Sequence, residues 1–106
     1  MTLLAWMIFA AAAVLEVGGD AVVRKGLRGH EVLFVLAGAV MLGCYGLVVN
    51  QVKWDFAKLL GVYVGVFALV SVLVGRYFFK EAVPFSTWIG LGIILAGGLV
   101  VQFGPK

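Results

Sequence analysis

The chain alternates between long apolar segments and short clusters of charged residues. Four apolar segments can be marked out, at residues 3–23, 32–52, 59–79 and 85–103. A helix needs about 20 consecutive, mostly apolar residues to cross the hydrocarbon core of a bilayer. The pattern therefore predicts an all-α integral membrane protein, in which four transmembrane helices form a single domain over residues 1–106.

Composition agrees with this pattern and excludes several classes of protein. Of the 106 residues, 64% are hydrophobic and only 12% are charged, and the mean hydropathy is +1.17. So little chain remains outside the four segments that a soluble catalytic or nucleic-acid-binding domain has no room. The net charge of +3 is therefore assigned to the membrane surfaces, and we expect neither an enzyme nor a nucleic-acid partner.

No metal or cofactor site is expected either. The single histidine, His30, and the single cysteine, Cys44, have no further His or Cys at ligand spacing. The first apolar segment is expected to stay in the protein as a helix instead of being removed as a signal peptide. No basic residue precedes it, and its apolar character continues past residues 10–13.

Two carboxylates, Glu16 and Asp20, interrupt the first apolar segment at a spacing of four residues. A carboxylate at membrane depth costs about 2.5–3.5 kcal/mol on insertion scales, so such a residue is usually functional and faces protein or water. Both are candidate proton- and substrate-binding residues. Glu16 could instead be a protonated packing residue, and Asp20 could instead pair with Arg24, four residues further on.

Glycines and one tyrosine mark the second and third segments. Small residues allow close helix contact in lipid, so Gly38, Gly43 and Gly46 predict packing faces in the second segment. The third begins with a GxxxG spacing around Tyr63. Tyr63 is either an interior phenol, a candidate substrate-binding residue, or an anchor at the headgroups. Because aromatic faces attract cations, Tyr63 and Phe67 would suit an organic cation.

Loop charges give only a weak orientation signal. One side of the membrane receives five basic residues and the other three; they are Arg24, Lys25, Arg28, Arg76 and Lys80 against Lys53, Lys58 and Lys106. The positive-inside rule then slightly favours termini outside the cytoplasm. A bias this small permits insertion in both orientations, and an antiparallel homodimer would place two Glu16 faces around one cavity.

The whole chain resembles the small multidrug resistance family of the drug/metabolite transporter superfamily. The resemblance lies in four spans, Glu16 in the first, an aromatic residue in a glycine-bearing third, the run Phe78-Phe79-Lys80-Glu81, and a fourth segment containing GLGIILAGG. It implies an antiparallel dimer in the bacterial inner membrane that exchanges protons for cationic compounds. Glu16 stands where the family has its shared carboxylate, Tyr63 where it commonly has a substrate-stacking Trp, and Arg24 where a basic residue closes the first helix.

The chain departs from that family at Leu60, Phe67 and Asp20. The family usually has a tyrosine at the first position, a glycine at the second, and a threonine or apolar residue at the third. The runs Glu16-Val17-Gly18-Gly19 and Gly61-Val62-Tyr63-Val64 are also similar to the YnfA-like branch of small four-span proteins. These departures leave the substrate open.

The sequence thus favours a proton-coupled antiporter that exports small organic or hydrophobic cations. Burial disfavours the charged carboxylate, so a proton and a cation would compete for Glu16. The protein's partner in the dimer would be a second copy of the chain or a paralogous subunit. The alternative is a non-transporting subunit of a hetero-oligomer, for example in lipid-carrier flipping, in which Glu16 only holds helices together.

Overall fold

A computed structural model describes residues 2–104, and its regular structure there is entirely helical. The helices are α1 (Thr2–Gly29), α2 (Val32–Val49), α3 (Phe56–Tyr77) and α4 (Phe85–Phe103). All four are long and apolar enough to cross a membrane. The predicted all-α fold with four candidate spans is therefore confirmed. Lys106, which the loop-charge count includes, lies outside the described residues.

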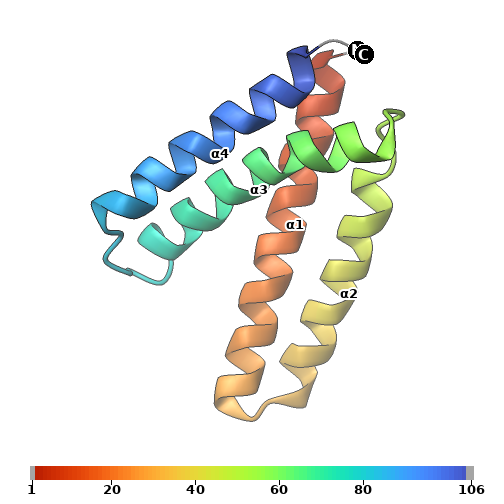
Figure 1. Cartoon of the computed structure of the whole chain (residues 1–106). Coiled ribbons are helices and arrows are strands. Elements are labelled where there is room, and N and C mark those ends of the chain that lie inside the picture. The colour runs from red at the N-terminus through yellow and green to blue at the C-terminus, as the bar shows by residue number, and fades with distance from the viewer. Residues whose placement is uncertain (1, 105–106) are drawn as a thin grey trace. The chain divides into compact units, whose positions relative to one another are not determined.

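The chain is divided into two compact units. One extends to Lys53 and contains α1 and α2, and the other begins at Trp54 and contains α3 and α4. Each unit is a hairpin of two antiparallel helices lying side by side (Figure 1). Because each pair is joined by a short turn, the turn sets which residues of the two helices face each other.

Helix α1 continues to Gly29, beyond the end expected at residue 23. The charged residues after Val23 mark the edge of the apolar stretch, but Arg24, Lys25 and Leu27 all favour helix. The helix ends where His30 adopts a left-handed conformation (φ 55°). There the backbone N–H of Glu31 donates to the carbonyl of Gly26 at 2.8 Å, which turns the chain into α2.

The other helix ends also depend on local hydrogen bonds. Helix α2 ends at Val49 and not at residue 52, because the next two side chains bond back to its last turn. Asn50 Nδ2 donates to the carbonyl of Gly46 at 2.8 Å, and Gln51 Nε2 donates to that of Leu47 at 3.1 Å. Helix α3 runs from 56 to 77 instead of 59–79, whereas α4 has the expected bounds 85–103.

Three glycines, Gly19, Gly26 and Gly38, lie where the backbones of α1 and α2 approach each other, and we call them the glycine seam. A Cβ atom added at Gly26 would lie 2.8 Å from the backbone nitrogen of Val35. One added at Gly38 would collide with Val23 Cγ2 and would lie 2.7 Å from the carbonyl oxygen of Gly19. The two backbones therefore touch at the seam, as expected for small residues between helices in lipid.

Glycines also bring α3 and α4 together. A Cβ atom at Gly61 would lie 3.2 Å from Val101 Cγ1, and one at Gly65 would lie 3.4 Å from Leu95 Cδ2. The close approach predicted by the GxxxG spacing is therefore confirmed, and its occupant is α4. By contrast, several glycines face open space within the described part of the chain; they are Gly43, Gly46, Gly90, Gly92 and Gly97. In α2, only Gly38 packs against another helix of the described chain.

Candidate functional site

Glu16 lies on α1 and is half-buried in the structure. The glycines that follow it face α2, since a Cβ atom at Gly18 would lie 3.1 Å from Met41 Cε and one at Gly19 would lie 3.0 Å from Leu42 Cγ. The carboxylate thus lies directly before residues of α1 that pack against α2. The α2 side chains beside these glycines, Met41 and Leu42, are apolar.

Tyr45 on α2 lies opposite Glu16 in the register of the first hairpin. The contacts Gly19 to Leu42, Val23 to Gly38 and Gly26 to Val35 show that equal steps forward in α1 and backward in α2 stay in register. Glu16 lies three residues before Gly19, and Tyr45 lies three residues after Leu42. The same register therefore places Glu16 opposite Tyr45. The two groups interact electrostatically, so a phenol and a carboxylate share this part of the hairpin.

Sequence reasoning did not select Tyr45 as a site residue. The cost of burying a carboxylate draws attention to the first apolar segment, whereas Tyr45 lies on the second. A usable signal was nevertheless present, because a short turn fixes the register of an αα-hairpin. With the turn placed at His30 and Glu31, residues 16 and 45 are equally distant from it.

Asp20 lies one helical turn after Glu16 on α1, in a different environment. Glu16 is half-buried, whereas Asp20 and Arg24 are both exposed. At a spacing of four residues the two carboxylates share a face of the helix. The structure therefore provides one sheltered and one accessible carboxylate on the same helix.

Tyr63 belongs to the second unit, where it is 3% exposed on α3. Its ring centroid lies 6.4 Å from that of Phe67, with the ring planes tilted by 36°. This distance is within the range of attractive aromatic pairs. The two aromatic residues singled out for cation binding are thus neighbours on α3, and Tyr63 occupies an interior position.

The residues considered for metal binding are not gathered into a site in the part of the chain described here. Within residues 2–104, no group of three or more His, Cys, Asp or Glu side chains could hold a metal ion. Cys44 is exposed on α2, and His30 lies in the turn after α1.

Comparison with known proteins gives a consistent result over the full length. The model of the YnfA/UPF0060 family, described as an "Uncharacterised BCR" family, matches residues 2–106. The "UPF0060 membrane protein" of Nocardia farcinica is 35% identical over 102 residues, which cover 94% of this chain and 92% of the relative. The "UPF0060 membrane protein YfjF" of Bacillus subtilis is 32% identical over 108 residues, which cover 100% and 99%.

A third relative, the "UPF0060 membrane protein sll0793" of Synechocystis, is 30% identical over 107 residues and is covered over 99% of its length. All three are named only as membrane proteins. No solved structure matches the chain significantly.

Proposed function

Because the chain belongs to the YnfA/UPF0060 family of membrane proteins, we propose that it is a proton-coupled antiporter exporting small organic or hydrophobic cations. The observation that carries the proposal is the half-buried carboxylate of Glu16 on a candidate transmembrane helix. The phenol of Tyr45 lies in its electrostatic range. An ionisable residue in such a helix costs free energy, so its presence there usually indicates a function.

The chemistry of the proposed exchange follows from desolvation. Away from water, an isolated carboxylate is stabilised either by taking up a proton or by pairing with a cation. These two occupants exclude each other at one carboxylate, so entry of one requires release of the other. Inward movement of protons then drives outward movement of cations, with no covalent step, no cofactor and no enzymatic activity.

We assign secondary roles to Asp20 and Tyr63. Exposed Asp20, one turn from Glu16 on the same helix face, would attract the cation. Tyr63, beside Phe67, would supply an aromatic face to the cation. These roles follow the resemblance to the small multidrug resistance family, in which a carboxylate and an aromatic residue hold the substrate.

The proposed assembly is an antiparallel homodimer, or a dimer with a paralogous subunit, in the bacterial inner membrane. Support comes from the glycines of α2 and α4 that face open space, namely Gly43, Gly46, Gly90, Gly92 and Gly97. Small residues on a lipid-facing surface allow a second helix to approach closely.

Reconstitution into proteoliposomes tests the function directly. Purified protein is placed under an imposed proton gradient, and proton currents are recorded while a panel of organic cations is added. Glu16→Gln should abolish the substrate-evoked current, because the amide can neither release a proton nor pair with a cation. Asp20→Asn should reduce it, and Glu31→Gln, which alters an exposed carboxylate in the turn after α1, should leave it unchanged.

The same experiment separates the alternative role as an accessory subunit. In that case the purified wild-type protein gives no current with any cation, and Glu16→Gln lowers the dimer fraction measured by native mass spectrometry. Normal substrate-evoked currents in Glu16→Gln would refute the exchange at Glu16.

A further inference from the structure

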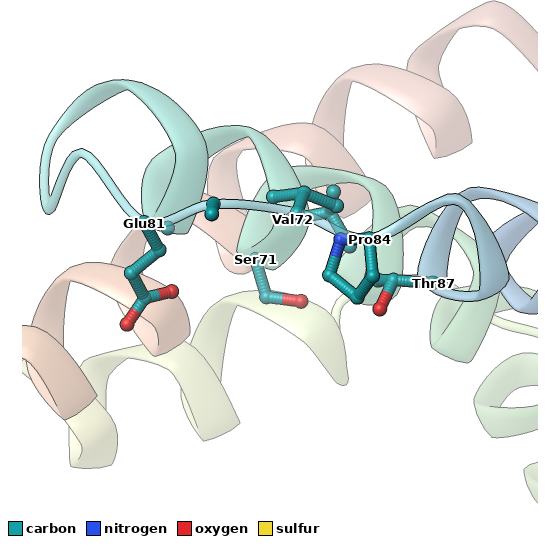
Figure 2. A pocket seen from close by; sticks show the side chains of 8 residues that line it. Ser71, Val72, Glu81, Pro84 and Thr87 are labelled. Atoms are coloured by element: carbon teal, nitrogen blue, oxygen red, sulfur yellow. The ribbon is translucent and has the colours of Figure 1, made fainter.

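A pocket of about 260 Å³ lies between the end of α3 and the beginning of α4 (Figure 2). Its lining includes the carboxylate of Glu81 and the hydroxyls of Ser71 and Thr87, and its apolar wall is formed mainly by Val72, Val83 and Pro84. Figure 2 shows the oxygen-bearing ends of Glu81, Ser71 and Thr87 on the same side of the connecting loop. This loop joins two candidate spans, so it lies at a membrane surface.

The backbone of the loop holds Glu81 over the last turns of α3. Lys80 adopts a left-handed conformation (φ 53°), and the N–H of Glu81 donates to the carbonyl of Gly75 at 3.0 Å. The side chain folds back as well, since a Cβ atom at Gly75 would lie only 2.7 Å from Glu81 Oε1. Only glycine at position 75 leaves room for the carboxylate in this position.

This carboxylate lies at the C-terminal end of α3. The C-terminal end of a helix carries a partial negative charge, which repels anions and attracts cations. Within residues 2–104, the carboxylate of Glu81 forms no hydrogen bond or ion pair. The nearby guanidinium of Arg76 lies over the ring of Tyr77 at 5.4 Å.

The other polar groups of the pocket are also suited to a ligand that donates hydrogen bonds. Ser71 Oγ donates its proton to the carbonyl of Ala68 at 2.9 Å, so its lone pairs remain available as acceptors. The backbone N–H of Thr87, which could have bound an anion, already donates to the carbonyl of Pro84 at 3.0 Å. The pocket therefore offers one carboxylate and two hydroxyl oxygens.

We propose that this pocket binds a primary ammonium group carried on a short carbon chain. An ammonium has three N–H donors, one for each of the three oxygen-bearing side chains of Glu81, Ser71 and Thr87, and the apolar wall accommodates the carbon chain. A divalent metal ion would need about six or more oxygen ligands. The volume is below that of pockets for drug-sized ligands, which restricts the ligand to a small amine or a headgroup.

Two sources could supply this group, a free amine in water or the headgroup of an ethanolamine phospholipid. The lipid would place its phosphate beside two basic residues, Arg76 in the last turn of α3 and Lys80 in the loop. The free amine would use the pocket alone. The site lies outside the hairpin that carries Glu16, so its existence does not depend on the transport proposed above.

A titration of the complete ¹⁵N-labelled protein tests the site. The protein is placed in nanodiscs of phosphatidylcholine and phosphatidylglycerol, which contain no primary ammonium group. In one arm ethanolamine is added to the buffer, and in the other phosphatidylethanolamine replaces phosphatidylcholine. Shifts of the Gly75, Glu81 and Thr87 amide signals report binding, and choline serves as a ligand without N–H donors.

Ethanolamine, phosphatidylethanolamine or both should shift these signals, whereas choline should not. A response to phosphatidylethanolamine that Arg76→Gln weakens identifies the lipid source, and a response to ethanolamine that Arg76→Gln leaves unchanged identifies the free amine. Glu81→Gln should weaken binding about 10- to 100-fold, the value of a hydrogen bond to a charged group. Asp55→Asn, which alters another exposed carboxylate of this unit, should bind as the wild type does.

Gly75→Ala is the second variant, because it keeps the charge of Glu81 but displaces the carboxylate; it should also weaken binding. The site is refuted if neither amine shifts the signals, if choline shifts them equally, or if Glu81→Gln binds as tightly as the wild-type protein. The comparison of ethanolamine with choline uses the wild-type chain and remains decisive if a variant fails to fold.

Discussion

Substitution of Gly38 by alanine should separate the two helices of the first hairpin. The added Cβ would collide with Val23 Cγ2 and would lie 2.7 Å from the carbonyl oxygen of Gly19 and 2.8 Å from the backbone nitrogen of Val23. Restoring an ordinary contact of about 3.5 Å requires a movement of about 0.8 Å. Because two of the obstructing atoms belong to the backbone of α1, no change of rotamer can provide it.

The expected cost is obtained by comparison with Gly43→Ala on the same helix. Nothing in the same chain lies within 4 Å of a Cβ atom at Gly43, so in the monomer, at high dilution in lipid, this variant reports only the gain in helix propensity, up to about 1 kcal/mol. Both variants share that gain. The difference between them therefore isolates overpacking, which typically costs about 1–3 kcal/mol.

This difference is measured by reversible unfolding of the purified variants in bicelles, with steric trapping used to monitor the unfolding. Gly38→Ala should have a free energy of unfolding about 1–3 kcal/mol lower than Gly43→Ala. Adding Val23→Ala should not restore stability, since it removes the side-chain clash but leaves the backbone ones. Equal stability of Gly38→Ala and Gly43→Ala, or full rescue by Val23→Ala, would refute the backbone contact described for the seam.

Two further predictions concern aromatic residues of the second unit. Tyr63→Leu should weaken the binding of an organic cation about 2- to 30-fold, as expected for the loss of one cation–π contact of about 0.5–2 kcal/mol. Tyr63→Phe keeps the ring and should retain most of the affinity, so equal effects of both variants in a binding titration would contradict this role. Lys58 Nζ lies 4.6 Å from the centroid of the Trp54 ring. A double-mutant cycle with Lys58→Gln and Trp54→Leu should give a coupling energy of about 0.5–1 kcal/mol. A coupling energy of zero would show that the two side chains lie close together without stabilising the protein.

The number of helices could be predicted from hydropathy because the bilayer sets a minimum length, which four segments within residues 2–104 satisfy. Their ends could not, since charge marks the edge of the apolar stretch and hydrogen bonding decides where the helix ends. The continuation of α1 to Gly29 and the return of the Asn50 side chain to Gly46 both illustrate this difference. Hydropathy contains no information about either.

The candidate site was predictable in part. Glu16 could be selected from the sequence because placing a carboxylate in an apolar span costs free energy. This cost is a property of a single residue, so no knowledge of its neighbours is needed. Tyr45 and the pocket at Glu81 depend on pairs of residues, and the register of a hairpin or the course of a loop must be known before such pairs are visible. Lys80 in a left-handed conformation places Glu81 over α3, and nothing in the residue types at 75–81 required it.

The division of the chain after Lys53 has a consequence for biosynthesis. In each hairpin the contacting residues are close in sequence, so the entropy lost in closing the loop between them is small. The first hairpin is complete before the third helix has been synthesised, and it can assemble as soon as both its helices have entered the bilayer. A ribosome-bound chain that has exposed only the first hairpin should therefore already contain the glycine seam and the sheltered Glu16.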